Sequence, residues 1–401
     1  MRVGIIGGGA AGFFSAIHVK ENYPDSEVII FEKSLKTLSK VRISGGGRCN
    51  VTNACTSISQ FAKAYPRGQK LMKKLMSRYN NSDVIRWFEK RGVPLVVQED
   101  QCIFPRSQQS QSVIDCFLQE CHRNKISIRT KYKIDSMQIE DTSILLKNQD
   151  QVECFDKVIV CTGGSPKLSG LSWLMQLGLQ IVHPVPSLFT FNMPDEDIKS
   201  LMGIVVEDAM VRVQGSKIRT DGPLLFTHWG MSGPAVLKAS SIGARWMHEN
   251  DYQFNISVNW VHSKNDQLLR NSFVDIQREH HSKLVKNYRP EGIPIRLWEY
   301  LLKKIDLPDS FRWKDIDQKW TEKLMGIVMN DQYRIRGKTT FKEEFVTAGG
   351  VCLSSINPTS LASKKYPHLY FAGEILDIDG ITGGFNFQAA WTTAYVAAQL
   401  A

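Results

Sequence analysis

The chain has 401 residues, of which 42% are hydrophobic and 22% are charged. This composition is typical of a globular protein and excludes an intrinsically disordered chain, and the length favours two or three domains. The formal net charge is +10, and its distribution along the chain is uneven. No apolar run is long enough to cross a membrane, and we expect a cytoplasmic protein without a secretory leader.

Eight cysteines are spread along the chain, and none has Cys-x-x-Cys or zinc-ligand spacing. Such cysteine usage is typical of a reducing compartment. The sequence therefore predicts neither a redox dithiol nor a bound metal.

The first secondary-structure elements form a predicted βαβ unit. A short apolar strand at Val3–Ile6 runs into a glycine-rich turn, a helix continues to about Asn22, and a second β-rich strand covers Glu27–Phe31. Strand, glycine turn, helix and strand in this order are typical of dinucleotide-binding folds.

The turn carries G-x-G-x-x-G on Gly7, Gly9 and Gly12, and Glu32 follows twenty positions after the last glycine. In this pattern Gly7 allows the chain to turn, Gly9 lets the backbone approach a pyrophosphate, and Gly12 allows helix and sheet to pack closely. The helix N-terminus attracts the pyrophosphate, and Glu32 accepts hydrogen bonds from the adenosine ribose. The fingerprint predicts a bound dinucleotide but does not separate FAD from NAD.

A basic segment follows the βαβ unit. The stretch from Lys33 to Ser82 contains eleven Lys or Arg residues and no Asp or Glu. Such a run is either an ordinary solvated face or a source of positive potential that attracts phosphate.

Three consecutive glycines, Gly45–Gly47, stand inside this basic segment and are followed at once by Arg48. Glycines at this point allow the backbone to press against an extended cofactor, and Arg48 then supplies charge to a phosphate or a substrate. Ser44 and Asn50 are the neighbouring hydrogen-bonding groups. The alternative interpretation is a glycine-rich surface turn with an incidental arginine.

The middle of the chain changes character twice. Two amphipathic helices are predicted at 82–91 and 112–124, and a buried strand with a glycine turn at Asp156–Gly164. From about Pro186 to Val261 the pattern is rich in β-formers. From Ser263 to about Arg336 the chain is charged and helical in pattern.

The last part of the chain returns to the first pattern. His368–Glu374 is again a strand followed by glycine and an acid, and an alanine-rich helix begins at Gly383 and Gly384. A reduced flavin carries negative charge on its pyrimidine side, which a helix N-terminus stabilises. We therefore favour FAD over NAD as the bound cofactor.

Several segments resemble one bacterial flavoprotein family. They are the GGGAAG turn, ISGGGRCNVTN, PLLFTHWGMSGPAVL, VTAGGVCL and LYFAGEILDIDGITGGFNFQAAWTTAY. The segments are similar to those of the NAD(P)/FAD-dependent oxidoreductases, a family that includes aminoacetone oxidase-like proteins and flavoproteins of bile-acid dehydroxylation. The SGGGRCN and GE-x-LD-x-DG-x-TGG-[YF]-N motifs are the specific ones.

The resemblance implies an α/β fold in which a discontinuous Rossmann-like FAD-binding domain, of the two-dinucleotide-fold type, contains an inserted β-barrel-like domain and a small helical domain. We expect the FAD-binding domain at 1–185 and 350–401, the inserted β-rich domain at 186–261 and 337–349, and the helical domain at 262–336.

The resemblance also implies, position by position, which residues hold FAD. They are Gly7, Gly9, Ala11, Gly12, Glu32, Lys33, Ser44, Gly45, Gly46, Arg48, Cys49, Asn50, Thr162, Gly163, Gly373, Glu374, Asp377, Gly384 and Asn386. One segment departs from the family pattern, since KLSGLSWLMQLG follows Pro166 where similar proteins have a G-S-x-G-D-G type of continuation.

Three residues are candidates for a catalytic role. His228 is a candidate general acid, although a lone histidine is more often structural. Arg48 is a candidate for contact with substrate. Cys49 is reactive if Arg48 and a helix end lower its pKa, and is otherwise a small packing residue beside the flavin.

The leading functional hypothesis is an FAD-dependent oxidoreductase that NAD(P)H reduces transiently and that passes hydride to a small organic substrate. The alternatives are a flavoprotein oxidase that acts on an amine and uses oxygen, and a flavin-containing, RNA-associated protein. The expected partner is a small-molecule substrate; nucleic acid is the less favoured partner, and neither a membrane nor an obligate protein partner is inferred.

Overall fold

A computed structural model describes residues 1–149, 151–262, 265–339 and 346–401. The chain divides into two compact units, unit 1 comprising Met1–Ser187 with Phe341–Ala401 and unit 2 comprising Leu188–Thr340. Within the described ranges, no helix combines the length and the apolar character that crossing a membrane requires.

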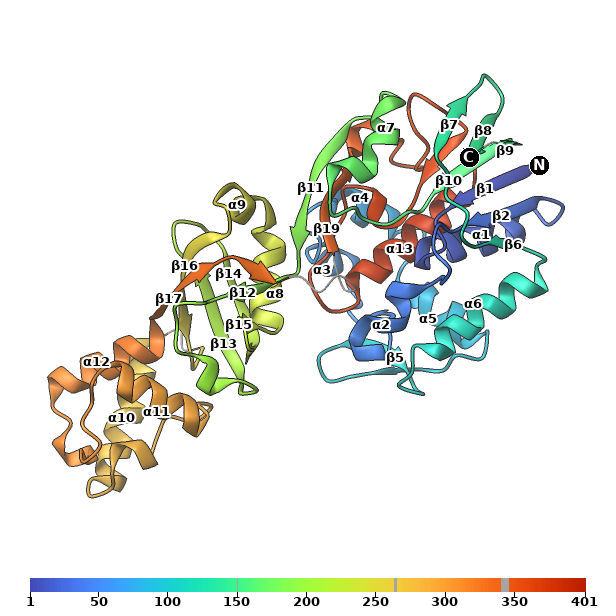
Figure 1. The fold of residues 1–401 in the computed structure, drawn as a ribbon. Helices are drawn as coiled ribbons and strands as arrows, with labels where there is room; N and C mark the ends of the chain where they lie inside the picture. Colours follow the sequence, from blue (N-terminus) through green and yellow to red (C-terminus); the bar gives the residue numbers. More distant parts are fainter. Residues whose placement is uncertain (150, 263–264, 340–345) are drawn as a thin grey trace. The chain divides into compact units, whose positions relative to one another are not determined.

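Unit 1 is built on a five-stranded parallel sheet with the strand order β20-β10-β1-β2-β6 (Figure 1). The strands are β1 (Arg2–Ile6), β2 (Glu27–Phe31), β6 (Ser127–Arg129), β10 (Lys157–Val160) and β20 (Leu369–Phe371). The four strands other than β6 are apolar and buried apart from the first residues of β1, β2 and β10, as in sheets that are covered on both faces.

Helices α1 and α13, from opposite ends of the chain, lie side by side in unit 1 (Figure 1). The ring of Phe14 in α1 lies 5.2 Å from that of Trp391 in α13, and both side chains are fully buried. The helices of unit 1 are α1 (Ala10–Asn22), α2 (Ser39–Gly47), α3 (Ile58–Ala62), α4 (Gln69–Leu75), α5 (Asn81–Glu89), α6 (Gln111–Arg123), α7 (Ser172–Gln176) and α13 (Phe385–Ala397).

Three small antiparallel sheets complete unit 1. They consist of β3 (Thr52–Asn53), β5 (Cys102–Pro105) and β4 (Leu95–Val97); of β7 (Ser136–Ile139), β8 (Ile144–Asn148) and β9 (Gln151–Phe155); and of β11 (Ile181–Ser187) and β19 (Val346–Val351).

Unit 2 contains a seven-stranded antiparallel sheet with the order β17-β16-β13-β14-β15-β12-β18. Its strands are β12 (Thr190–Asn192), β13 (Val205–Val213), β14 (Arg219–Phe226), β15 (Gly230–Ser232), β16 (Gln253–Asn259), β17 (Asp331–Arg336) and β18 (Lys338–Thr339). In the described residues the end strands β17 and β18 do not pair with each other, so the sheet is open rather than a closed barrel.

The helices of unit 2 form one apolar core with the sheet. Trp298, on the buried face of α11, donates its indole N–H to the carbonyl of Val285 at 2.9 Å. The helices are α8 (Pro234–Ile242), α9 (Ala244–Glu249), α10 (Asp266–His280), α11 (Ile295–Lys304) and α12 (Gln318–Met329).

The structure confirms the expected fold class, an α/β protein whose parallel sheet is interrupted by an inserted β-rich part with helices. One segment differs from the expectation, because Asp331–Arg336 is strand β17 and not part of a helical region. It pairs with β16 and buries alternate residues, Tyr333 and Ile335 among them. The three domain boundaries given above stay a prediction.

Candidate functional site

Four parallel strands of unit 1 end in one row. Phe31, Ile6, Val160 and Phe371 are neighbours in the register of β2, β1, β10 and β20. Because in-register parallel strands end at the same edge, the loops after them start side by side. Glu32, Gly7–Gly12, Thr162–Gly163 and Gly373–Glu374 belong to these four loops or to the first turn of α1. The sheet thus brings nine of the nineteen sequence-predicted FAD residues to one edge.

The three fingerprint glycines have different surroundings. Gly7 has φ +114°, and a Cβ there would lie 2.4 Å from the carbonyl oxygen of Cys161. At Gly12 a Cβ would lie 1.9 Å from the carbonyl oxygen of Gly7, whereas at Gly9 it would meet no atom within 4 Å. Gly7 and Gly12 are therefore required by packing, and Gly9 leaves open space beside the backbone.

Gly9 is also the N-cap of α1, which has no side-chain cap and no acid in its first turn. Free N–H groups and the helix dipole make such a terminus attractive to an anion. Ala11, in the same turn, is buried, and its Cβ lies where a side chain at Gly373 would go. Ala11 and Gly373 thus bring α1 close to the loop that follows β20.

Glu32 lies at the end of β2 and folds back onto the glycine turn. Its carboxylate accepts hydrogen bonds from the backbone N–H of Gly8 at 2.9 Å and of Ser34 at 2.8 Å. The side chain is half-buried and Lys33 beside it is exposed. These bonds fix the carboxylate next to the turn. A carboxylate in this place is able to accept a hydrogen bond from a ribose hydroxyl.

The segment 44–47 combines extended backbone at Ser44 with left-handed backbone at the glycines. Gly45, Gly46 and Gly47 have φ values of +58°, +68° and +84°, a region that favours glycine. A Cβ at Gly46 would meet nothing within 4 Å, whereas at Gly45 it would lie 2.9 Å from the ring of Phe104. At Gly47 the nearest atom to a Cβ would be the carbonyl oxygen of Arg42, 4.0 Å away, so Gly46 and Gly47 both leave room for a ligand.

Arg48 is held by its own loop. Its guanidinium lies 4.2 Å above the ring of Phe104, and its Nε donates to the carbonyl oxygen of Gly45 at 3.0 Å. One end of the guanidinium also reaches Gln108 at 3.4 Å. These contacts orient Arg48 and leave the remaining N–H groups to serve an anion.

Cys49 is fully buried, and burial raises the pKa of its thiol to about 12 in spite of a hydrogen bond with Ser44. The pKa rises because the loss of solvent outweighs the hydrogen bond with Ser44. Cys49 is therefore a protonated thiol at neutral pH, which favours the packing role over the reactive one. Its place among the catalytic candidates stays a prediction.

Helix α13 begins at the left-handed residue Gly384, with φ +87° and no side-chain cap. With its amide turned to satisfy its neighbours, Asn50 accepts from the N–H of Gly384 and donates to the carbonyl of Thr52. Asn386 exchanges two hydrogen bonds with the backbone of Gly380, at 2.8 and 2.9 Å. The N-terminus of α13 is thus fixed by Asn50 and Asn386, and its first turn contains no acidic residue.

A polar cluster lies between the loops after β10 and β20. Glu374 accepts a hydrogen bond from the N–H of Thr347 at 2.8 Å and forms an ion pair with Lys40 at 2.8 Å. A Cβ at Gly164 would lie 2.4 Å from both the Glu374 carboxylate and the Thr347 hydroxyl. The buried Thr347 hydroxyl has no hydrogen-bond partner in the described residues, which marks it as a group open to a ligand. Thr162 is exposed, and Gly163 has open space and φ +74°.

A buried ion pair that was not predicted from the sequence lies beside this cluster. Asp379 is completely buried and forms two hydrogen bonds with the guanidinium of Arg67, and it accepts a third from Ser187 at 2.9 Å. Burial raises the pKa of Asp379 although Arg67 opposes that shift. Asp377, which was predicted, is half-buried in the same loop. The LDIDG motif contains both acidic residues, but the sequence does not indicate which of them is the buried partner of Arg67.

His228 belongs to unit 2, where it is exposed on the turn between β14 and β15. The structure therefore places it outside the unit that carries the FAD residues, and its candidate role as a general acid stays a prediction.

The residues at the sheet edge fit a bound FAD. Gly9, Gly46 and Gly163 leave open space against the backbone, and Thr347 has a buried hydroxyl without a partner. Two uncapped helix N-termini, one at each end of the chain, supply dipoles for a pyrophosphate and for a flavin.

Comparison with known proteins agrees with this geometry. A family described as "HI0933-like protein Rossmann domain" matches residues 1–400. The chain is 28% identical over 405 residues to an Escherichia coli protein named ribosomal RNA dihydrouridine synthase, covering 98% of this chain and 96% of that protein. It is 24% identical over 408 residues to a Clostridium scindens protein named 3-dehydro-bile acid delta(4,6)-reductase, covering 100% and 98%.

Among solved structures, a 3-ketosteroid-delta4-(5alpha)-dehydrogenase from Rhodococcus jostii has a similar fold, with a TM-score of 0.51 and 12% identity, covering 99% of this chain and 96% of that one. Since the identity is low, this likeness concerns the fold. The resemblance inferred from the motifs is confirmed, and the chain belongs to the HI0933-like Rossmann-domain family of FAD-dependent oxidoreductases.

Proposed function

We propose that the protein is an NAD(P)H-dependent flavoenzyme that reduces a carbon–carbon double bond conjugated to a carbonyl group. Two relatives that match along almost the whole chain support this proposal through their names. Dihydrouridine is uridine with its 5,6 double bond saturated, and that bond is conjugated to a carbonyl. A 3-dehydro-delta(4,6) bile acid likewise has double bonds conjugated to a ketone. The two substrates differ greatly in shape. We therefore apply to this chain only the reaction they share, the reduction of a double bond conjugated to a carbonyl.

The observation that carries the proposal is the pair of uncapped, glycine-led helix N-termini at one sheet edge. When bound there, FAD supplies the hydride-carrying chemistry. The residues that would hold it are Gly7, Gly9, Ala11, Gly12, Glu32, Lys33, Ser44, Gly45, Gly46, Arg48, Cys49, Asn50, Thr162, Gly163, Gly373, Glu374, Asp377, Gly384 and Asn386.

Each part of the site has a physical task in this proposal. The N-terminus of α1 attracts the pyrophosphate, for which Gly9 leaves space, and Glu32 accepts hydrogen bonds from the ribose. The N-terminus of α13, held by Asn50 and Asn386, stabilises negative charge on the pyrimidine side of the flavin. The buried Arg67–Asp379 pair keeps the loop before α13 in place.

The experiment is an anaerobic visible spectrum of the FAD-loaded protein before and after addition of NADPH or NADH. We expect the flavin absorbance to bleach with at least one of them and to return when an α,β-unsaturated ketone or a uracil nucleoside is added. A flavin that stays yellow with both nucleotides but bleaches with a primary amine would replace this proposal with the amine oxidase.

A second candidate is the reduction of uracil within RNA, and a surface feature favours it. Lys63, Lys70, Lys73 and Lys74, on or near α3 and α4, are exposed, and the described part of the chain contains no ion pair to any of them. Unpaired surface cations of this kind bind phosphate backbones in a salt-dependent way. The E. coli relative is also named for an RNA substrate.

This candidate is tested by incubating the protein, FAD and NADPH with ribosomal RNA and measuring dihydrouridine by mass spectrometry of the nucleosides. A fourfold charge-reversed variant with Glu at these lysines should bind RNA more weakly and keep its flavin reduction by NADPH. Unchanged RNA and no salt-sensitive binding at low salt would eliminate it.

A further inference from the structure

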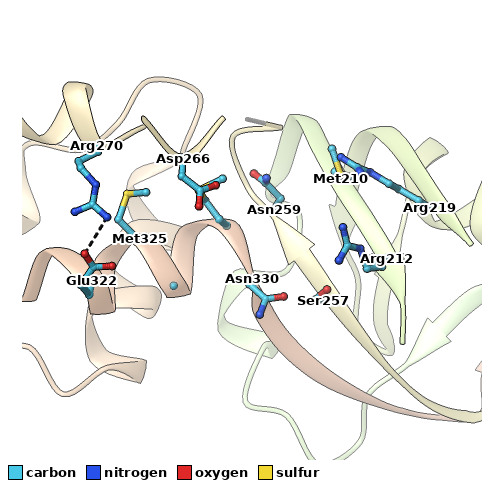
Figure 2. Close-up of a pocket in the computed structure, with 12 residues that line it drawn as sticks. Met210, Arg212, Arg219, Ser257, Asn259, Asp266, Arg270, Glu322, Met325 and Asn330 are labelled. Atoms are coloured by element: carbon cyan, nitrogen blue, oxygen red, sulfur yellow. Dashed lines mark hydrogen bonds and ion pairs between the residues drawn. The ribbon is translucent and has the colours of Figure 1, made fainter. Parts of the chain in front are cut away.

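Unit 2 contains a pocket of about 510 Å³ that the proposed flavin chemistry does not use. One wall is the polar face of strands β13, β14 and β16, and the other consists of helices α10 and α12 (Figure 2). Pockets that bind small molecules typically have volumes of about 300–1,000 Å³. All residues of this pocket lie in unit 2, whereas the proposed FAD residues lie in unit 1.

Two exposed arginines lie side by side on the sheet wall. Arg212 of β13 and Arg219 of β14 are directly opposite in the antiparallel register, and both line the pocket (Figure 2). Like charges at directly opposite positions repel each other and destabilise a sheet. In the described ranges neither arginine forms an ion pair with a carboxylate.

The single side-chain hydrogen bond of Arg219 in the described residues goes to a weak acceptor. Its Nε donates to the thioether sulfur of Met210 at 2.7 Å, and a thioether accepts hydrogen bonds poorly. On the facing wall, by contrast, Arg270 is paired with Glu322 at 2.8 Å (Figure 2). The sheet wall therefore carries two arginines without an ion-pair partner in the described residues. The helix wall carries a compensated pair and also the carboxylate of Asp266, which lines the pocket (Figure 2).

Gly326 lies in the interior of α12 and lines the same pocket. Glycine weakens a helix relative to alanine because of its backbone entropy. Neither the backbone nor the neighbours require it, since its φ is not positive and a Cβ would meet nothing within 4 Å. The glycine is exposed, and its missing side chain leaves this part of the pocket open.

The walls also differ in polarity in a way that suits a phosphate attached to a ring. Ser257 and Asn259, both largely buried, provide hydrogen-bonding groups beside the arginine pair. Met325 and Met329 provide an adaptable apolar surface on α12. Phosphate at one end and an apolar ring surface at the other are the requirements of a nucleotide.

We propose that this pocket binds a nucleotide, with its phosphate between Arg212 and Arg219 and its base or sugar against Met325 and Met329. Two arginines bind a phosphate through charge-assisted hydrogen bonds, which also removes their mutual repulsion. The nucleotide is either a free one, such as the phosphorylated adenosine part of a dinucleotide, or one unit of an RNA chain. The shared chemistry is the phosphate ester of a nucleoside.

The test uses protein saturated with FAD, so that the FAD residues are occupied, and measures binding calorimetrically. The probes are inorganic phosphate, AMP, adenosine 2′,5′-bisphosphate and a short RNA oligonucleotide. We expect AMP or the bisphosphate to bind more tightly than phosphate, and Arg212→Ala and Arg219→Ala each to weaken that binding by at least about tenfold. Gly326→Leu, which fills the pocket without removing a charge, should abolish it.

The matched control is Arg334→Ala, since Arg334 is exposed on strand β17 of the same sheet and does not line the pocket. It should bind the probes as the parent protein does, and thermal unfolding checks that all variants are folded. Tighter binding of the bisphosphate identifies a free dinucleotide as the source, and tighter binding of the oligonucleotide with the same arginine dependence identifies RNA. Equal affinity for phosphate and AMP, or equal losses in Arg334→Ala and Arg212→Ala, would overturn the proposal and leave the flavin chemistry untouched.

Discussion

Replacing two glycines of the same turn by alanine separates cofactor binding from folding. A Cβ at Gly9 meets no atom within 4 Å, whereas a Cβ at Gly12 would lie 1.9 Å from the carbonyl oxygen of Gly7. The φ of Gly9 is −97°, which alanine adopts without strain. The two variants add the same methyl group three residues apart and should behave very differently.

For Gly9→Ala we expect the free energy of unfolding of the apo-protein to change by less than about 0.5 kcal/mol, as for an unhindered surface substitution. The dissociation constant for FAD should rise by at least about tenfold, equivalent to about 1.4 kcal/mol, because the methyl group takes the space of the pyrophosphate. For Gly12→Ala the helix must move away from the turn, and overpacking of this kind costs about 1–3 kcal/mol.

The assay is a titration of apo-protein with FAD, followed by quenching of flavin fluorescence, together with urea unfolding of each apo-protein. Gly326→Ala is the matched control, since Gly326 also has open space around it but belongs to unit 2; it should bind FAD normally. If Gly9→Ala binds FAD with parental affinity, or loses as much stability as Gly12→Ala, the assignment of the open space at Gly9 to the cofactor is refuted.

Three further predictions concern buried groups. Arg67→Met should lower the free energy of unfolding by about 3–5 kcal/mol, because it leaves the Asp379 carboxylate buried without its cation. In urea unfolding, adding Asp379→Leu to this variant should restore part of the lost stability. Additive losses in the double variant would contradict this prediction. Cys49→Ala should keep the parental rate of flavin reduction in stopped-flow measurements, since a thiol with a pKa of about 12 is not a nucleophile at pH 7; a large loss of rate would restore the cysteine as a catalytic candidate. The free energy of unfolding should fall above about pH 9 by about 1.4 kcal/mol per pH unit for each buried thiol, because unfolding releases protons that the folded state retains. Urea unfolding between pH 8 and 10.5 measures this change. A flat profile would show that these thiols ionise in the folded protein. The thiols whose pKa burial raises to about 12 are Cys49, Cys116, Cys121 and Cys161.

The parallel sheet and its glycine turns were predictable because their signals are local. Strand β1, the turn at Gly7–Gly12 and helix α1 are contiguous in sequence, and each glycine has a specific steric reason. The same holds for β20 and α13 near the other end of the chain. Local patterns of this kind predict elements, and the right-handed βαβ rule then brings their ends to one edge.

Strand β17 was assigned to the helical region because charged residues around it dominate the composition. Its sequence, DQYRIR, alternates between buried and exposed positions along the whole strand, which is the period of a strand. Six residues form a short pattern beside the longer helical patterns of α10 and α12. The composition of the surrounding chain therefore decided the assignment, and the alternation within the six residues was missed.

The Arg67–Asp379 pair and the protonation of Cys49 are properties of tertiary structure. Residues 67 and 379 are separated by 312 positions, and no local pattern reports such a contact. For Cys49, the adjacent Arg48 is visible in the sequence but the burial of the thiol is not, and burial is the main cause of the raised pKa. Sequence patterns predicted which loops form the site, and packing decided the chemical state of the groups within it.

The order of strands in the parallel sheet has a consequence for how the protein is made. Strand β10 pairs with β1 on one side and with β20 on the other, but Lys157–Val160 leave the ribosome about two hundred residues before Leu369–Phe371, and the whole of unit 2 is synthesised in between. At the usual rate of about 5–20 residues per second, one edge of β10 waits for about ten seconds or more without its neighbour. Unpaired edges of apolar strands promote aggregation, so the nascent chain is most in need of chaperones during that interval.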